Sequence, residues 1–155
     1  MITVTRLNHA VLYVRELERS VEFYQSILGM VEVARMGRKM AFLRTANSPN
    51  HHDLGLAALG SNAPLSPPGT VGLYHLAWEV ETIEELATAA QILKEKGYWQ
   101  GASDHGASKS VYGIDPDGNQ FEITWMVPRE AWGEFENEAI VAPLNLQLEL
   151  ERYGR

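Results

Sequence analysis

The sequence contains no cysteine among its 155 residues. This absence excludes disulfide scaffolds, cysteine nucleophiles, iron–sulfur clusters and every zinc site that needs a thiolate. A metal bound by this chain would therefore have to be held by His, Asp or Glu side chains. Five histidines are present.

The chain also lacks an excess of basic residues and any long apolar run. It has 20 Asp and Glu against 13 Lys and Arg, for a net charge of -7, whereas nucleic-acid binding depends on Lys and Arg. No apolar stretch approaches the roughly 20 residues of a membrane span, and the N-terminus lacks the charged-then-apolar order of a signal peptide. We expect a soluble cytoplasmic protein with no nucleic-acid and no membrane partner.

Several common catalytic motifs are missing as well. The chain has no GxGxxG, GxxxxGK[ST], GxSxG or HExxH pattern. Dinucleotide-binding, P-loop, α/β-hydrolase and zincin interpretations consequently have no support.

At this length we expect a single domain over 1–155. Its first half combines strand-like and helix-like patterns of apolar residues. Gly29 is a natural stop for the amphipathic helix that precedes it. The expected elements are a strand at 8–14, a helix at 16–28 and strands at 30–35, 40–44 and 54–59.

The second half repeats this order. Thr82 and Glu85 form a capping-box pattern ahead of a helix that stops at Gly97. The expected strands are 73–80, 110–114 and 120–125, with an irregular stretch between the helix and the second of them.

These patterns predict an α+β fold of paired βαβββ modules. The modules cover 4–59 and 72–126, a Pro- and Gly-rich connector covers 60–71, and 127–155 forms an ordered tail. Two sheets that each carry a helix on one face would leave their other faces free to close a shared cavity.

Three chemically distinctive side chains fall on corresponding faces of their strands. Because side chains alternate along a strand, His9, His75 and Glu122 each lie opposite a wholly apolar face. Two histidines and one carboxylate form the facial triad of non-haem Fe(II) enzymes, and Mn(II) suits the same ligands. The alternative is structural: two boundary histidines and a carboxylate that faces water.

Other polar residues could serve chemistry near such a metal. A histidine such as His52 or His105 can relay a proton, and the phenol of Tyr112 can donate to a developing anion. Each also has an ordinary interpretation: His51 and His52 as solvated loop residues, His105 as a turn residue and Tyr112 as a core aromatic.

The sequence resembles the vicinal oxygen chelate superfamily, and within it the single-module catechol 2,3-dioxygenase-like (type I extradiol) family. The resemblance covers nearly the whole chain. The matching segments are LNHAVLYVRELERSVEFYQSILGM, NHHDLGLAAL, GLYHLAWEV, SDHGASKSVYGIDPDGNQFEITW and PREAW. The DPDGN turn is common to the superfamily, whereas the paired histidines, the DHG loop and the tyrosine before DPDG are more specific to the dioxygenases.

The resemblance implies a half-open barrel around a metal site and a role for each candidate residue. It implies that His9, His75 and Glu122 bind Fe(II), with Mn(II) as the other possibility, and that His52 is the acid/base. Tyr112 would contact the substrate hydroxyl, and the DHG histidine, His105, would lie near the pocket.

The implied activity is extradiol cleavage of a catechol by O2 in a homo-oligomer, a dimer or larger. One alternative is a glyoxalase-type isomerase, lyase or thiol transferase, which would bring a fourth ligand or anion-binding arginines near the site. The strand at 54–58 offers no ligand, and apart from Arg44 the strands that would line the cavity supply few arginines. Another alternative is a metal-free protein that binds an aromatic drug.

Overall fold

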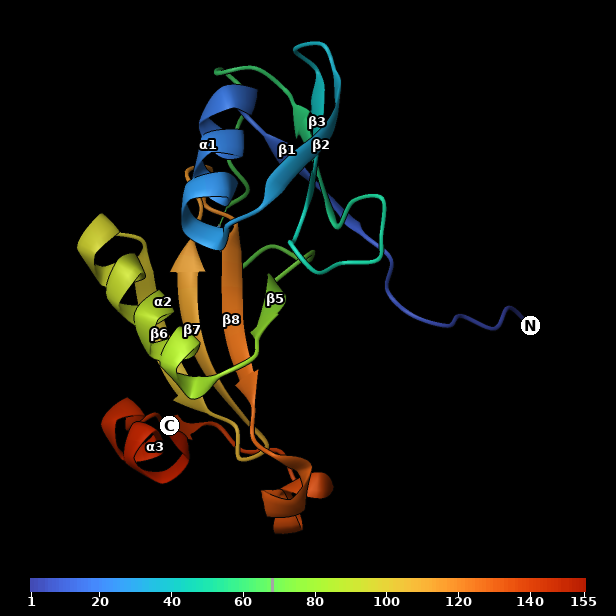
Figure 1. Ribbon diagram of the computed structural model, residues 1–155. Helices are drawn as coiled ribbons and strands as arrows, with labels where there is room; N and C mark the ends of the chain where they lie inside the picture. The colour runs from blue at the N-terminus through green and yellow to red at the C-terminus, as the bar shows by residue number, and fades with distance from the viewer. Residues whose placement is uncertain (68) are drawn as a thin grey trace. The chain divides into compact units, whose positions relative to one another are not determined.

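The computed structural model describes residues 1–67 and 69–155. The chain forms two compact units, Met1–Pro67 and Pro68–Arg155, and each holds one sheet with helical cover (Figure 1). The division falls inside the segment 60–71 that the sequence analysis identifies as a connector.

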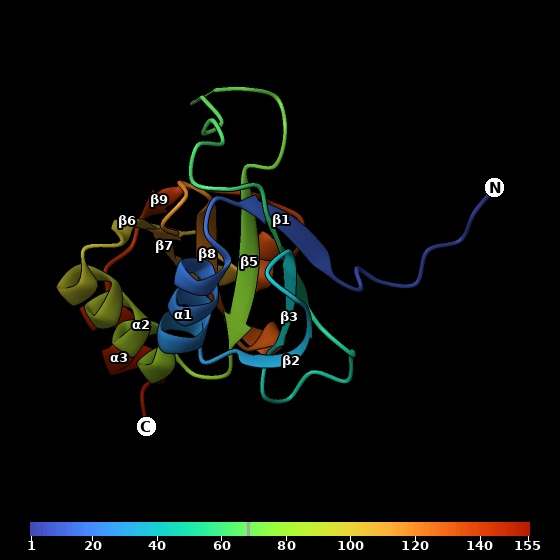
Figure 2. The ribbon, with the colours of Figure 1, turned by 90° about the horizontal axis from the view of Figure 1, so that it is seen from above.

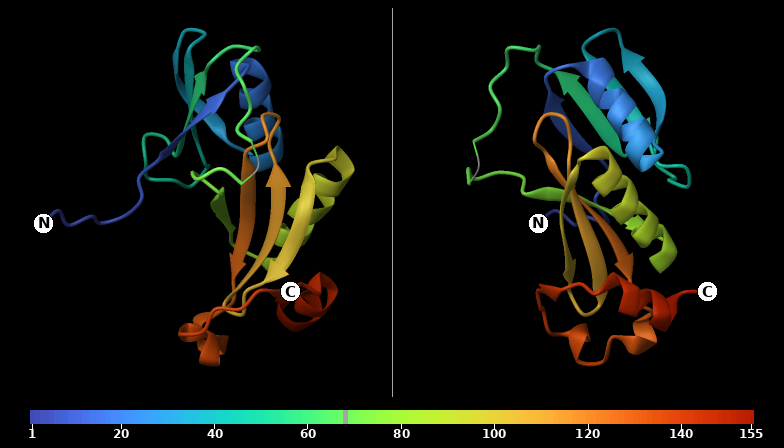
Figure 3. Two further views of the ribbon diagram at one scale, coloured as in Figure 1. Left: turned by 180° about the vertical axis from the view of Figure 1, so that it is seen from behind. Right: turned by 90° about the vertical axis from the view of Figure 1, so that its left-hand side faces the viewer.

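The first unit has one helix and a four-stranded sheet. Its elements are β1 (Ala10–Val14), α1 (Leu17–Leu28), β2 (Val31–Met36), β3 (Met40–Arg44) and β4 (Leu54–Ala58). The strand order is β1-β4-β3-β2, in which β1 and β4 are parallel and the other neighbours antiparallel. α1 covers one face of this sheet (Figure 3).

Alternation along β1 separates the core from the opposite face. Leu12 and Val14 are buried toward α1, whereas Val11 and Tyr13 are 49% and 70% exposed. We call this second face, which α1 does not cover, the open face of the first sheet. Val11 and Tyr13 therefore contribute exposed apolar surface to this face.

The second unit has a longer sheet and a C-terminal extension. Its elements are β5 (His75–Val80), α2 (Ile83–Lys96), β6 (Trp99–Asp104), β7 (Ser108–Ile114), β8 (Gln120–Met126), two 3-10 turns (Arg129–Ala131 and Gly133–Glu136), β9 (Ala142–Pro143) and α3 (Leu146–Tyr153). The strand order is β5-β8-β7-β6-β9. α2 begins at the predicted capping box of Thr82 and Glu85 and packs on β5, β6, β7 and β8.

The tail after β8 folds back onto the second unit. β9 pairs with β6 as the edge strand, and α3 lies beside α2 (Figure 2). Gly106, in the turn between β6 and β7, has positive φ and lies against the Phe135 ring. The tail therefore contacts the β6–β7 turn, which carries His105.

The α+β class and the repeated βαβββ order are confirmed. One prediction was wrong: the stretch treated as irregular contains β6, and β7 begins at Ser108 rather than at 110. The sequence QGASD has little intrinsic strand preference, and β6 carries a register shift between Trp99 and Gly101. Pairing with β7 and β9 creates this strand.

The ends of two other strands also differ from expectation. His9 lies one residue before β1, and β5 begins at His75 rather than at 73. No helix in the described part of the chain is long and apolar enough to cross a membrane. The half-open barrel, which concerns how the two sheets combine, stays a prediction.

Candidate metal and substrate site

The first unit brings His9 and His52 together. Their ring centroids are 4.5 Å apart, and the Phe42 ring lies 4.9 Å from that of His52. His9 Nδ1 lies 2.8 Å from Asn8 Oδ1, and His51 Nδ1 lies 3.1 Å from His52 Nδ1. Burial, followed by the neighbouring His9 and His51 rings, lowers the pKa of His52 below its usual value.

A cluster of hydrogen-bonded polar residues connects the segment before β1 to the loop that carries His52. Asn50, which is 8% exposed, donates through Nδ2 to the Asn8 carbonyl at 2.7 Å and to Asp53 Oδ1 at 2.8 Å. Arg6 Nη2 donates to Asn50 Oδ1 at 2.5 Å. Asn50 thereby holds the chain on either side of the His9–His52 contact.

Asp53 is the acceptor at the centre of this cluster. Its two oxygens receive hydrogen bonds from the Ser48 hydroxyl, the Asn50 amide and both the backbone N–H and hydroxyl of Thr45. Burial alone would raise the pKa of Asp53, but these hydrogen bonds outweigh it and lower the pKa. The carboxylate is therefore charged at neutral pH.

Asn50 and Asp53 are not among the site residues predicted from the sequence. The available signal was their spacing in a polar segment, since Asn and Asp side chains commonly bond to nearby backbone and organise loops.

The second unit brings His75 and Glu122 together. His75 Nε2 lies 2.9 Å from Glu122 Oε2, and Glu122 is 9% exposed overall. The strands β5 and β8 are parallel neighbours, with Ala77 opposite Glu122 in the register. Both side chains lie on the face opposite Phe121 and Ile123, which are buried.

This pair fits a metal site. Two donors about 2.1 Å from one ion and at right angles to each other lie about 3 Å apart, which matches the observed spacing. The His75 Nδ1 atom is buried and has no hydrogen-bond partner among the described residues. Buried polar atoms without partners are rare in structural positions and are found where a side chain has another role.

Tyr112 lies next to this pair on the same face. It stands opposite Glu122 in the β7–β8 register, and its ring centroid is 5.8 Å from that of His75. Burial, and then the negative charge of Glu122, raises the pKa of the Tyr112 phenol. The phenol is therefore protonated at neutral pH and can serve as a hydrogen-bond donor.

A hydrogen bond with His105 sets the orientation of the Tyr112 hydroxyl hydrogen. His105 Nδ1 lies 3.0 Å from the Ile140 carbonyl oxygen, and His105 Nε2 lies 2.8 Å from the Tyr112 hydroxyl. A carbonyl only accepts, so Nδ1 carries the hydrogen. In the neutral ring Nε2 is then an acceptor, and Tyr112 donates to it.

The tail, through the Ile140 carbonyl, and a partly buried ion pair support this turn. Lys109 Nζ lies 2.5 Å from Asp104 Oδ1, which also accepts from the Gly106 N–H. The hydrogen bond from His105 to the Ile140 carbonyl could not be predicted from the sequence, because every residue supplies the same backbone oxygen.

The candidate residues thus fall into two groups within their own units. His9 and His52 are together in the first unit, and His75, Glu122, Tyr112 and His105 are together in the second. In the described residues no group of three or more His, Asp or Glu side chains forms a complete metal cluster. The joint His9, His75 and Glu122 site stays a prediction.

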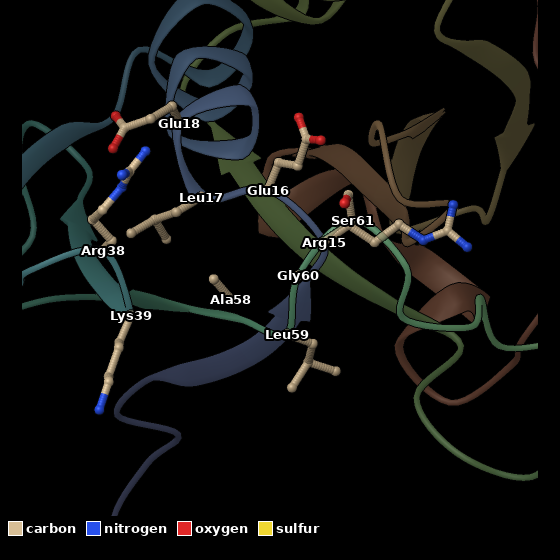
Figure 4. A pocket seen from close by; sticks show the side chains of 10 residues that line it. All are labelled: Arg15, Glu16, Leu17, Glu18, Arg38, Lys39, Ala58, Leu59, Gly60 and Ser61. Carbon is tan, nitrogen blue, oxygen red and sulfur yellow. The ribbon is translucent and has the colours of Figure 1, made fainter.

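A separate pocket of about 490 Å³ lies in the first unit. It is lined by Arg15, Glu16, Leu17, Glu18, Arg38, Lys39, Ala58, Leu59, Gly60 and Ser61 (Figure 4). This hollow follows the end of β1 that is remote from His9. Its Arg15 and Lys39 side chains point in different directions (Figure 4), so they do not converge on one ligand.

A comparison with protein families supplies the family. The sequence pattern of the "Glyoxalase/Bleomycin resistance protein/Dioxygenase superfamily" matches residues 6–123. The chain belongs to this superfamily. Its repeated βαβββ order is the one that the sequence resemblance implies for the vicinal oxygen chelate fold.

Several similar curated proteins are named as dioxygenases. The "Catechol-2,3-dioxygenase" of Bacillus subtilis (strain 168) is 32% identical over 129 residues, which are 83% of this chain and 44% of that protein. "Biphenyl-2,3-diol 1,2-dioxygenase 3" of Rhodococcus globerulus is 35% identical over 125 residues, covering 79% of this chain and 64% of that protein. The "Manganese-dependent 2,3-dihydroxybiphenyl 1,2-dioxygenase" of Geobacillus genomosp. 3 is 31% identical over 130 residues, covering 81% and 38%.

The chain therefore spans between 38% and 64% of the length of these three relatives. A solved structure of a superfamily domain from Frankia sp. EAN1pec is 21% identical, has a TM-score of 0.67, and covers 81% of this chain and 100% of that domain. This structural likeness supports the fold alone.

Proposed function

We propose that this superfamily member is an extradiol dioxygenase that cleaves a catechol-type ring next to its two hydroxyls. The observation that carries this proposal is the His75–Glu122 pair, with Nε2 and Oε2 2.9 Å apart beside a phenol. The names of the similar proteins point to the same reaction class.

The proposed metal ligands are His9, His75 and Glu122, with Fe(II) as the metal and Mn(II) as the alternative. When bound, such a metal would supply Lewis acidity and one-electron chemistry for the reaction of a diol with O2. The similar protein that is named as manganese-dependent supports keeping both metals under test.

The first unit would supply the base. His52 carries ring nitrogens beside His9 and is only partly exposed, so it can take a proton from a catechol hydroxyl and later return it. Phe42, at 4.9 Å from His52, offers an apolar surface for the ring of the substrate and limits the access of water to the base.

The second unit would hold the substrate oxygen through Tyr112. While His105 is neutral, the Tyr112 hydrogen is directed to His105 Nε2, so the phenol oxygen accepts from a substrate hydroxyl. This hydroxyl, the one that does not give its proton to His52, can then pass its proton to the Tyr112 oxygen while the Tyr112 hydrogen moves to His105 Nε2. Protonated Nε2 would donate to the phenol oxygen, and the proton received from the substrate would let Tyr112 stabilise the anionic substrate oxygen that remains. This order refines the simple donor role predicted for Tyr112.

The glyoxalase-type alternative has less support. β4 consists of Leu54, Gly55, Leu56, Ala57 and Ala58, and none of these side chains can act as a fourth metal ligand. Fewer protein ligands leave more positions for a chelating diol and O2.

The activity is tested by loading the full chain with Fe(II), and separately with Mn(II), without oxygen. A panel of catechols is then added with O2, and oxygen uptake and the yellow ring-cleavage product are measured. We expect one O2 consumed per catechol and both oxygen atoms in the product. Protein that demonstrably holds either metal yet consumes no oxygen with any catechol would contradict the proposal.

The metal site is tested separately by Glu122→Ala. We expect this variant to lose stoichiometric metal binding, measured by metal analysis after desalting, because it removes the one anionic ligand. Glu95→Ala is the control, since Glu95 is exposed on α2 and bonds to Gln91. Full retention of the metal by Glu122→Ala would show that the ligand set is misassigned.

A further inference from the structure

Arg44 is a positively charged side chain on the open face of the first sheet. It is the last residue of β3, in which Ala41 and Leu43 are fully buried on the α1 side. Alternation therefore places Arg44 on the same face as Phe42, whose ring contacts His52. Arg44 is itself only partly exposed.

The Arg44 guanidinium has almost no partner within the described chain. Its one contact is from Nη1 to the Asn50 carbonyl at 3.5 Å, which is long for a hydrogen bond. None of the ion pairs found in the described residues involves Arg44. Charges with reduced solvent access are normally paired, so this group has capacity for an external anion.

A second guanidinium approaches the same asparagine. Arg6 binds the Asn50 side chain, while Arg44 approaches the Asn50 carbonyl. The one carboxylate of this cluster, Asp53, accepts hydrogen bonds from Ser48, Thr45 and Asn50 instead of from either arginine. Two positive charges thus lie around a neutral residue in a chain whose net charge is -7.

We propose that Arg44, assisted by the charge of Arg6, binds a carboxylate carried by the aromatic substrate. This inference rests on the proposed dioxygenase function and specifies its substrate class as carboxylated catechols. A guanidinium presents a planar fork of donors that matches a carboxylate with two parallel hydrogen bonds. The Phe42 and His52 rings next to it offer the aromatic surface that the rest of such a molecule requires.

The first test measures binding without any chemistry. Benzoate and its neutral analogue benzamide are titrated into the metal-free full chain by calorimetry and by NMR of the arginine side chains. We expect benzoate to bind more tightly than benzamide, and Arg44→Gln to weaken benzoate binding by about 10- to 100-fold, the range for hydrogen bonds to a charged group. Arg44→Lys should recover part of the loss, because it keeps the charge without the fork.

A matched control separates this site from general charge effects. Arg35→Gln removes an exposed arginine of β2 that is paired with Glu18 and Glu32, and benzoate binding should be unchanged. An equal loss in Arg35→Gln and Arg44→Gln would overturn the proposal. Unchanged circular dichroism and melting temperature in Arg44→Gln establish that the variant is folded.

The second test compares substrates in the metal-loaded enzyme. We expect kcat/KM for 2,3- or 3,4-dihydroxybenzoate to fall by about 10- to 100-fold in Arg44→Gln, while kcat/KM for unsubstituted catechol changes by less than about threefold. Equal losses for charged and neutral catechols, or wild-type protein that cleaves only neutral catechols, would overturn the assignment of Arg44.

The two proposals fail in different ways. Arg44-dependent benzoate binding in a protein that cleaves no catechol would support the carboxylate site and refute the dioxygenase. Catechol cleavage without any benzoate binding would support the dioxygenase and refute the carboxylate site.

Discussion

At the residue scale, the histidines of this chain are distinguished by what surrounds each ring. His51 is exposed, whereas His52, one residue later, contacts the rings of both His9 and Phe42. His75 pairs with Glu122 at 2.9 Å, and His105 bridges a backbone carbonyl and a phenol. The same side chain is therefore suited to ligand, base or positioning roles according to its neighbours.

Replacing His52 with Phe should slow turnover selectively. The variant keeps an aromatic ring beside Phe42 but loses the nitrogen that carries the proton, so we expect kcat to fall by roughly 10²–10⁴-fold. Metal content and catechol affinity should be retained. His51→Phe is the control, and equal kcat values for the two variants would mean that His52 is an ordinary loop residue.

Replacing Asp53 with Asn should lower stability in a pH-dependent manner. The amide would place a donor against the donors of Thr45 or Ser48, which costs about 1–3 kcal/mol. Because the folded pKa of Asp53 lies below its ordinary value of 3.8, its stabilisation is complete above about pH 5 and is lost as the pH falls through the lowered pKa.

Urea unfolding of wild-type protein and Asp53→Asn at several pH values checks this prediction. The difference in the free energy of unfolding should be largest at neutral pH and should shrink below about pH 4. A difference that is constant from pH 7 to pH 3 would contradict a role for the charged carboxylate.

At the element scale, the two halves owe their similarity to the same physical rule. Each helix covers the apolar face of its sheet, which leaves the opposite face to the polar and aromatic side chains that matter for the site. The second unit adds the tail, whose β9 pairs with β6 and whose Phe135 lies against Gly106. The tail therefore supports the turn that carries His105.

Replacing Gly106 with Ala should disturb this contact. Gly106 has φ of +76°, and an added methyl group would overlap the Phe135 ring. We expect a loss of about 2 kcal/mol or more in the free energy of unfolding, combining backbone strain with overpacking. Gly97→Ala is a matched control, because Gly97 has φ of +77° but no neighbouring atom at that position.

The double variant Gly106→Ala with Phe135→Ala isolates the overlap. Its loss of unfolding free energy should be smaller than the sum of the two single losses, since the smaller side chain makes room for the methyl group. Identical losses in Gly106→Ala and Gly97→Ala would show that the Phe135 contact contributes nothing to the stability of the turn.

At the scale of the whole molecule, the central prediction is that both units contribute to one metal site. The first unit offers His9 and the second offers His75 and Glu122. A site assembled in this way would make metal binding depend on residues far apart in the sequence. The homo-oligomer and the half-open barrel are further predictions at this scale.

His9→Ala in the full chain tests whether the site is shared. We expect metal affinity to fall by more than about 100-fold. Substituting a residue that only hydrogen-bonds to a metal ligand already lowers metal affinity by about 10–100-fold, and His9 is a proposed ligand itself. His75→Ala should produce a comparable loss, and the His51→Phe protein should bind metal normally. Stoichiometric metal in His9→Ala at wild-type affinity would restrict the site to the second unit.

The sequence by itself determined the order of the elements other than β6 and β9, and the faces of the strands. Apolar periodicity, Gly stops and the Thr82 capping box depend on local chemistry, so they could be read without a structure. The same alternation identified His9, His75 and Glu122 as candidates, because strand faces follow from position alone.

Only the tertiary structure decided which groups meet. β6 has little intrinsic strand preference and exists because β7 and β9 pair with it. The His75–Glu122 distance and the tautomer of His105 depend on contacts between residues remote in sequence. Such contacts are set by the packing and register of neighbouring strands, which no single segment encodes.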